Sequence, residues 1–155
     1  MTETELKETI ARIASPDEAA RAAAHAHWAK LAKPLGGLGR LETMIEDAAA
    51  LTGREDIVVS RRAVFVLCAD NGVVAQGVSQ TDQSVTRRTT SVCRMAETAH
   101  CDVVPVDIGM AGEKVRGVLD RRIADGTADF TQGPAMTRAQ TIGAIEGGMR
   151  LVRDW

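Results

Sequence analysis

An apolar run that stops abruptly at polar residues dominates the pattern of this chain. Residues 63–69 (AVFVLCA) carry no polar side chain and are rich in β-branched or bulky groups, and residues 70–72 (DNG) follow at once. Such a run is typical of a strand that is covered on both faces of a parallel sheet. Because ligands of open α/β sheets bind outside the carboxyl ends of the strands, we expect a site in the polar loop of residues 70–86.

The sequence before this run predicts helices. Residues 3–14 place apolar side chains three and four positions apart, which is the spacing of an amphipathic helix. Ser15 and Glu18 are spaced as in a capping box, so a second helix is expected to begin there and to continue to about Ala32. A third helix is expected over residues 40–51.

A glycine-rich turn, residues 33–39 (KPLGGLG), leads into the third predicted helix. Exposed backbone N–H groups at the start of a helix can bind an anion, so an anion cradle is one interpretation of this turn. The turn is neither a Walker loop nor a GxGxxG after a strand. We therefore favour the interpretation that it is a plain connector.

A second apolar run, residues 102–109, also ends in a carboxylate close to a glycine. The helical pattern of residues 91–100 separates it from the first run, and this order predicts two parallel strands in a βαβ unit. Asp70 and Asp107 would then emerge at the same edge of the sheet. Pro105 has no N–H to donate, which predicts an edge position or a bulge there.

The C-terminal part begins with a polar stretch, residues 113–132, that glycines interrupt and in which residues 115–123 could form a short extended segment. Thr137 and Gln140 then mark the start of a last helix that reaches about Arg153.

These elements predict an α/β fold, a Rossmann-like parallel sheet with flanking helices. Residues 1–60 are assigned to an N-terminal helical segment that forms part of a small helical domain, and residues 61–155 to a partial Rossmann-like domain. A strand should follow the last helix, and the sequence ends there, so we expect the sheet to be incomplete.

The composition and charge of the chain argue against several classes of protein. The chain has 155 residues, of which 45% are hydrophobic and 26% charged, and its net charge of -2 predicts no nucleic-acid partner. No signal peptide and no apolar stretch of membrane-spanning length is found, so we expect a cytoplasmic protein without a membrane partner. The three cysteines lack a CxxC spacing and are interpreted as buried thiols, and neither they nor the three histidines predict a metal site.

Four stretches, in this order, carry a resemblance to a known family. They are residues 33–42 (KPLGGLGRLE), 69–86 (ADNGVVAQGVSQTDQSVT), 91–110 (SVCRMAE and then VVPVDIGM) and 124–140 (ADGTADFTQGPAMTRAQ). They resemble the N-terminal half of the nicotinate-nucleotide:dimethylbenzimidazole phosphoribosyltransferases. The resemblance implies a glycosyltransferase of cobalamin lower-ligand assembly, usually a homodimer, that needs no cofactor. Such an enzyme transfers phosphoribose from nicotinate mononucleotide to 5,6-dimethylbenzimidazole and yields α-ribazole 5′-phosphate and nicotinate.

The candidate substrate-binding residues lie at the ends of the two strands or in the loop after the first. They are Asp70, Asn71, Gly72, Thr81, Gln83, Val85, Thr86 and Asp107. The four from Thr81 to Thr86 match, by resemblance, the region that lines the aromatic-base pocket. For Asp70, hydrogen bonding to backbone N–H groups is weighed equally against substrate contact. For Asp107, a cap of a helix or turn is favoured over a catalytic role.

The chain departs from the family in two respects. The general-base glutamate and most contacts to the nucleotide phosphate belong to the family's C-terminal half, beyond Trp155, so we assign no catalytic residue here. The segment between Thr86 and Thr90 is shorter than in the family, where it helps to wall the base pocket.

An isolated half of the enzyme would expose apolar surface, so we expect a homodimer or a chain completed by a C-terminal partner segment. The alternative from another class is a non-catalytic module that binds benzimidazole or phosphate, or a subunit that another chain completes.

Overall fold

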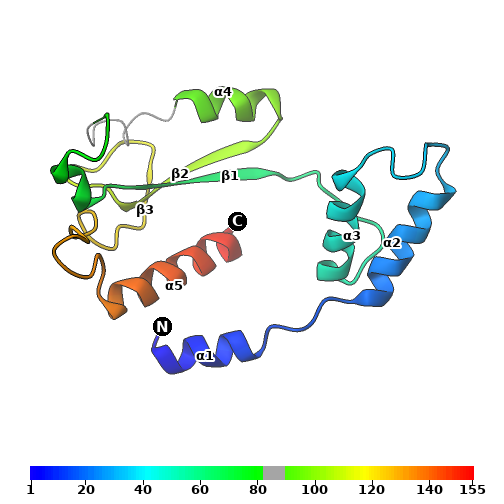
Figure 1. Ribbon diagram of the computed structural model, residues 1–155, viewed down its shortest axis with the longest axis horizontal. Coiled ribbons are helices and arrows are strands. Elements are labelled where there is room, and N and C mark those ends of the chain that lie inside the picture. The colour runs from blue at the N-terminus through cyan, green and yellow to red at the C-terminus, as the bar shows by residue number, and fades with distance from the viewer. Residues whose placement is uncertain (82–89) are drawn as a thin grey trace. The chain divides into compact units, whose positions relative to one another are not determined.

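A computed structural model describes residues 1–81 and 90–155 of the protein (Figure 1). The helices are α1 (Glu3–Ala11), α2 (Glu18–Lys30), α3 (Arg40–Thr52), the short 3-10 helix η1 (Gly72–Gln76), α4 (Thr90–Thr98) and α5 (Arg138–Asp154). The strands are β1 (Ala63–Ala69), β2 (Asp102–Gly109) and β3 (Leu119–Asp120).

The described chain divides into two compact units. One contains Met1–Thr9 together with Arg61–Trp155, and the other contains Ile10–Ser60. The start of α1 belongs with the sheet, since Arg138 of α5 donates a hydrogen bond of 2.7 Å to the Glu3 carboxylate. Whether either unit is a domain that folds on its own stays a prediction.

The sheet has the order β1-β2-β3, and both pairs of neighbouring strands are parallel. Figure 1 shows α4 and α5 on opposite sides of the strands, and α4 contacts β2. The predicted parallel sheet with flanking helices is therefore confirmed. Parallel strands need a crossover, and the segment that contains α4 supplies it between β1 and β2.

Strand β1 is less covered than the sequence predicts. Cys68 is its one buried residue, whereas Val64 is 37% exposed and Leu67 is 55% exposed. The prediction of a strand buried on both faces is thus wrong within the described chain. The physical reason is that α4 packs mainly on β2, which leaves side chains of β1 uncovered.

Pro105 does not mark an edge strand, because β2 is the middle strand of the sheet. The irregularity of the β1–β2 ladder lies between Cys68 and Ala69, so the prediction of a bulge at Pro105 is wrong, whereas the predicted edge position holds locally on the β3 side of β2. The proline is tolerated because β3 pairs only with Val106 and Asp107, so Pro105 itself has no β3 partner.

The start of α2 also differs from the prediction. Asp17, and not Ser15, is the N-cap, and its carboxylate accepts hydrogen bonds of 2.9 and 3.0 Å from two N–H groups of the first turn. A carboxylate also interacts favourably with the positive end of the helix dipole, which favours Asp17 at this position. The capping box of Thr137 and Gln140 at the start of α5 is confirmed.

The glycine-rich turn before α3 is closed by a carboxylate of the chain itself. Glu42 accepts hydrogen bonds of 2.8 Å from Lys33 Nζ and 3.0 Å from the backbone N–H of Leu38. The hydrogen bond from Lys33 is the main cause that lowers the pKa of Glu42, and the bond from Leu38 adds to it. Because this carboxylate takes up a turn N–H at the helix start, the geometry supports the connector interpretation.

The three thiols are all free, but their surroundings differ. Cys68 is buried, as predicted, and burial raises its pKa, with further contributions from Asp107 and Asp70. Cys93 and Cys101 are only half-buried, so the prediction of buried thiols is wrong for these two. Within residues 1–81 and 90–155, no helix has the length and apolarity needed to cross a bilayer.

Candidate functional site at the carboxyl edge of the sheet

Two buried carboxylates lie at the carboxyl edge of the sheet. Asp70 follows β1 directly and is 4% exposed, and Asp107 lies near the end of β2 and is 3% exposed. The parallel register pairs Cys68 with Asp107, so both aspartates are at the same edge, as the sequence predicts. Buried carboxylates require hydrogen-bond partners, and those partners define the site.

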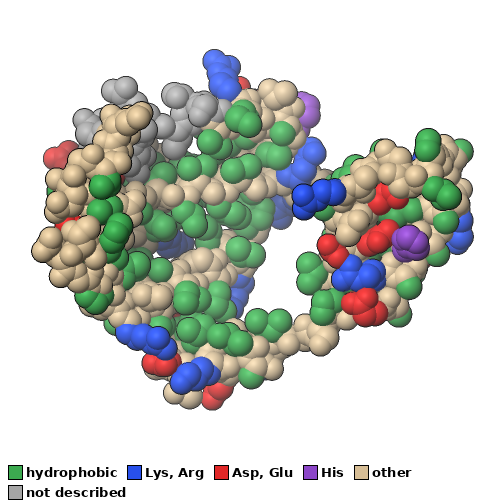
Figure 2. All heavy atoms as spheres, in the orientation of Figure 1, with side chains coloured by type: hydrophobic (Ala, Val, Ile, Leu, Met, Phe, Trp, Pro, Cys, Tyr) green, Lys and Arg blue, Asp and Glu red, His purple; other side chains and the backbone are tan. Residues whose placement is uncertain are grey.

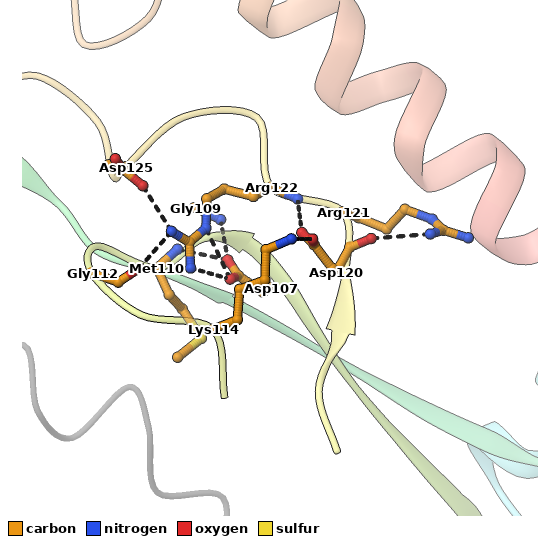
Figure 3. Close-up of polar contacts among 9 residues, drawn as sticks. All are labelled: Asp107, Gly109, Met110, Gly112, Lys114, Asp120, Arg121, Arg122 and Asp125. Carbon is orange, nitrogen blue, oxygen red and sulfur yellow. Dashed lines mark hydrogen bonds and ion pairs between the residues drawn. The ribbon is translucent and has the colours of Figure 1, made fainter. Parts of the chain in front are cut away.

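Asp107 is held by backbone and side-chain donors. Its Oδ1 accepts hydrogen bonds from the N–H groups of Gly109, at 3.0 Å, and Met110, at 2.8 Å. Its Oδ2 accepts two bonds from Arg122, at 3.0 Å from Nε and 2.7 Å from Nη2 (Figure 3). Asp107 thus acts as a turn cap, the role that sequence reasoning favours, and it also has a cationic partner.

Arg122 extends this network into the neighbouring loops. Its Nη1 donates 2.7 Å to the carbonyl oxygen of Gly112 and 2.8 Å to Oδ1 of Asp125. In Figure 3 the guanidinium lies between Asp107 and Asp125, so one side chain ties together β2, the loop after it and the loop after β3. Such a charged pair is expected to order the loops that it joins.

The protonation of Asp107 follows from these contacts. Burial alone would raise its pKa, but the hydrogen bonds from Arg122 and from the N–H groups of Met110 and Gly109 outweigh burial, so the pKa lies below its ordinary value. The hydrogen bond to Asp107 likewise raises the pKa of Arg122. An ionised, fully hydrogen-bonded carboxylate is a weak proton acceptor at neutral pH, which argues against Asp107 as a general base.

Asp70 joins the ends of the two long strands. Its Oδ2 accepts a hydrogen bond of 2.8 Å from the N–H of Ala111, and its own N–H donates 2.9 Å to the carbonyl of Gly109. The backbone-binding role weighed for Asp70 is therefore present in the structure. The donor lies in the loop after β2, 41 residues away, rather than in a local turn.

Asn71 and Gly72 pack against the segment that follows β3. Asn71 forms a parallel bridge with Thr127, and the N–H of Gly72 donates 3.1 Å to the Thr127 carbonyl. A Cβ added at Gly72 would lie only 2.6 Å from that carbonyl oxygen and 2.7 Å from the N–H nitrogen of Asp129. Only glycine allows the two segments to approach so closely.

The predicted base-pocket residues are only partly within the described chain. Thr81 is exposed, and its N–H donates 3.3 Å to the hydroxyl of Ser79. Gln83, Val85 and Thr86 lie outside the described residues. The aromatic-base pocket of the resemblance therefore stays a prediction.

Sequence reasoning missed Arg122, which is central to this edge. A usable signal was present, because a strand-terminal aspartate that is buried needs a cation, and Arg121 and Arg122 stand in tandem within the predicted extended segment, residues 115–123. Neighbouring side chains of an extended segment point to opposite sides. One of the two arginines could therefore be expected to face Asp107.

The comparisons with known proteins agree with one another. The family model described as Phosphoribosyltransferase (DBI_PRT) matches residues 13–155. Similar relatives are the nicotinate-nucleotide–dimethylbenzimidazole phosphoribosyltransferases of Acetivibrio thermocellus, 39% identical over 80% of this chain, and of Roseiflexus castenholzii, 38% identical over 96%. The crystal structure of CobT from Thermus thermophilus superposes on 87% of this chain with a TM-score of 0.76 and 37% identity.

The match covers less of the relatives than of this chain. The chain spans 38% of the A. thermocellus protein, 45% of the R. castenholzii protein and 44% of the T. thermophilus chain. Since the family model nevertheless matches nearly the whole sequence, the chain belongs to the nicotinate-nucleotide–dimethylbenzimidazole phosphoribosyltransferase family.

Proposed function

We propose that this protein contributes to the transfer of phosphoribose from nicotinate mononucleotide to a benzimidazole-type base, with release of nicotinate. The single observation that carries the proposal is the family match over residues 13–155, together with relatives whose names state this pair of substrates. The reaction joins a ring nitrogen to C1′ and needs a proton acceptor, a cleft for the flat base and donors for the phosphate.

The chain's share in this reaction is the base side of the site. The candidate substrate-binding residues are Asp70, Asn71, Gly72, Thr81, Gln83, Val85, Thr86 and Asp107, of which the four from Thr81 to Thr86 are assigned to the base pocket by resemblance. Among them, Asp70 and Asp107 have their carboxylates engaged by N–H groups or by Arg122, so their contribution is to position the loops. Direct contact with the base falls to the loop that contains Thr81.

Catalysis by this chain alone is not expected. The chain spans at most 45% of the relatives compared above, and the lowered pKa of Asp107 leaves it a weak base. A glutamate from the remaining part of the enzyme would accept the proton. The alternative is that this chain is a non-catalytic module that binds the base or a phosphate, or a subunit completed by another chain.

Association is part of the proposal. The edge strand β1 exposes Val64 and Leu67, and an exposed apolar edge strand is prone to pair with another chain. We expect a homodimer or a complex with a C-terminal partner segment that completes the Rossmann-like sheet. Sedimentation velocity at micromolar concentration tests this expectation, and a compact monomer with no sign of association would count against it.

We also propose a cytoplasmic location. Cys68, Cys93 and Cys101 are all free, which fits a reducing environment and hence the cytoplasm. Alkylation in freshly lysed cells under denaturing conditions should label all three cysteines. Incomplete labelling that reductant restores would contradict a cytoplasmic location.

The decisive experiment separates enzyme from module. The chain is incubated with nicotinate mononucleotide and dimethylbenzimidazole, and nicotinate release is followed by chromatography, first alone and then with the separately produced C-terminal part of a relative. Release only in the mixture supports the proposal. Thermal stabilisation by the base without release in either sample supports the binding module, and the absence of both effects refutes both.

A matched pair of variants locates the base. Thr81→Ala should weaken stabilisation by dimethylbenzimidazole, because Thr81 lies in the predicted base loop. Thr98→Ala on α4 should not, since its hydroxyl donates only to the carbonyl of Arg94. Equal effects of the two substitutions on stabilisation by dimethylbenzimidazole would contradict the proposal that the base binds at the loop containing Thr81.

A further inference from the structure

A crevice with two adjoining parts separates the sheet from α5. The inner cavity, of about 250 Å³, has aliphatic walls, which include Leu67, Val106, Ile108, Ile123, Ala144 and Leu151. The outer cavity, of about 470 Å³, shares Arg121, Ile123 and Gly147 with the inner one and is lined mostly by charged residues. In Figure 2, hydrophobic side chains gather on the strands and on α5 to either side of this crevice. Asp70 and Asp107 line neither cavity, so the crevice is separate from the carboxyl-edge site.

The space on the α5 side comes from glycines. Gly147 and Gly148 line the inner cavity, and a Cβ added at either position would meet no atom within 4 Å. Glycine weakens a helix interior, so these positions give up helix stability and leave a volume that side chains could have filled.

Several charges around the outer cavity are already paired. Arg122 pairs with Asp107 and Asp125, and Arg150 pairs with Glu146. These residues are therefore poor candidates for binding a further charged group.

One cation and one anion of the outer cavity are not paired. Within the described part of the chain, neither Arg121 nor Asp154 forms an ion pair, with each other or with another residue. Figure 3 shows the Arg121 side chain extending toward α5, with Nη1 donating 3.0 Å to the carbonyl of Asp120. A cavity that presents one unpaired charge of each sign is complementary to a zwitterion.

Asp154 stands at a position that favours a cationic ligand. It is the last residue of α5, where the carbonyl groups of the final turn lack helical partners and carry partial negative charge. A carboxylate at this end of a helix is unfavourable by itself, whereas a cation there is attracted by the helix dipole. An ammonium group beside Asp154 would interact favourably with both the carboxylate and the helix end.

We infer that the crevice binds a free α-amino acid with an aliphatic side chain, such as leucine. The carboxylate accepts hydrogen bonds from Arg121, which lines both cavities, and the ammonium group binds at Asp154 in the outer cavity. The side chain enters the inner cavity, which is large enough because an apolar cavity of about 150 Å³ already holds benzene. The inference does not depend on the proposed transfer reaction, since neither substrate of that reaction is an amino acid.

Binding is tested on the full 155-residue chain with leucine and with two analogues that each lack one of its charges. Isocaproate lacks the ammonium group, and isoamylamine lacks the carboxylate. With isoleucine methyl groups labelled for NMR, leucine should shift Ile108, Ile123 and Ile145, which line the inner cavity. Each analogue should bind about tenfold more weakly, because a hydrogen-bonded contact to a charged group is lost.

The other compact unit supplies the internal control for these spectra. Ile45 and Ile57 belong to that unit and should not move. The absence of shifts with leucine, shifts confined to those two methyl groups, or equal affinities for the three probes overturn the inference.

Nicotinate separates this inference from the proposed function. It has a carboxylate but no ammonium group, so it should bind in the crevice no more tightly than isocaproate does. If nicotinate shifts the same three methyl groups at lower concentration than leucine, the crevice is a substrate site and the amino-acid assignment is wrong.

Two substitutions test the two charges one at a time. Arg121→Gln should lower leucine affinity to that of isoamylamine and leave isoamylamine binding unchanged. Asp154→Asn should lower leucine affinity to that of isocaproate and leave isocaproate binding unchanged. Arg150→Gln is the matched control, because Arg150 lines the outer cavity but is paired with Glu146, so leucine affinity should change less than about twofold. Equal losses in all three variants contradict the assignment of the two charges.

A further substitution fills the cavity without removing a contact. Gly147→Leu should abolish binding of leucine, because its side chain would occupy the open volume, and the melting temperature should not fall, since leucine favours a helix more than glycine does. Unchanged binding in this variant refutes the crevice as the site. A folded variant that no longer binds leucine supports it.

Discussion

The carboxyl edge of the sheet and the crevice beneath α5 lie on the same strands but are built in opposite ways. At the edge, buried carboxylates and backbone N–H groups satisfy one another, and Gly72 is in close contact with the backbone of a neighbouring loop. At the crevice, Gly147 and Gly148 face open space, and Leu67 stays 55% exposed. The difference separates a region whose buried polar groups the chain satisfies by itself from a region that the described chain leaves open.

The largest effect is expected at Gly72. Gly72→Ala would place a Cβ 2.6 Å from the Thr127 carbonyl oxygen, and because the obstructing atoms are backbone, the loops must separate. We expect the free energy of unfolding to fall by about 3 kcal/mol, as for a severe overpacking change. Urea denaturation followed by circular dichroism measures this loss.

Gly133→Ala is the control for Gly72→Ala. It adds the same methyl group in a loop where nothing lies within 4 Å, so its effect should stay within about 0.5 kcal/mol. If both glycines accept alanine equally, the carboxyl edge is not closely packed.

Asp107→Asn should produce the next largest loss. It removes the charge that pairs with Arg122 at the carboxyl edge of the sheet, and we expect the free energy of unfolding to fall by about 2 kcal/mol. The pKa of Asp107 is lowered in the folded state, so its stabilising effect is present above the unfolded pKa of about 3.9 and is lost as the pH falls through the folded value. The stability of the wild type should therefore drop in acid more steeply than that of the variant.

The exposed partner of Arg122 gives the comparison for Asp107. Asp125→Asn changes a carboxylate whose side chain is 71% exposed, so we expect a loss of at most about 0.5 kcal/mol. Equal losses at Asp107 and Asp125 would show that burial at the edge adds nothing to the ion pair.

Local sequence patterns predicted much of the fold. The long strands, the parallel order and the shared edge of Asp70 and Asp107 follow from apolar runs that end in aspartate near glycine. The capping box at Thr137 was predictable because both of its hydrogen bonds lie within one helical turn. Such features depend on neighbours in the chain, and the sequence displays them directly.

The errors concern burial and contacts that local patterns in the sequence do not determine. Asp70 binds a N–H group 41 residues away, which no local pattern announces. Strand β1 has the composition of a strand covered on both faces, yet Leu67 stays half-exposed, because the composition of a strand does not specify which elements pack against it. At α2, Ser15 and Asp17 are both good N-caps, and only the geometry selected Asp17.

A charge on the exposed strand β1 should weaken association of the protein without affecting the carboxyl edge of the sheet. Val64→Lys places a charge on β1, which is 37% exposed at this residue, and charged side chains on edge strands discourage pairing with another chain. We expect the concentration at which the protein associates to rise by about tenfold, which corresponds to about 1.4 kcal/mol. Sedimentation velocity over a concentration series measures this change.

The control for Val64→Lys is Leu35→Lys, which alters a residue that is 90% exposed in the glycine-rich turn. It introduces the same charge in the other compact unit and should leave association unchanged. If both variants dissociate equally, the effect is due to net charge and the β1 edge is not the contact surface.

The smallest effect has the opposite sign. Gly148→Ala adds a methyl group within α5 where no atom lies within 4 Å, so nothing opposes the higher helix propensity of alanine. We expect a gain of about 0.8 kcal/mol in the free energy of unfolding, measured by urea denaturation of the isolated chain. A loss instead of a gain would mean that the added methyl group meets other atoms. The crevice beside Gly147 and Gly148 would then not be open, in contrast to what this comparison with the carboxyl edge assumes.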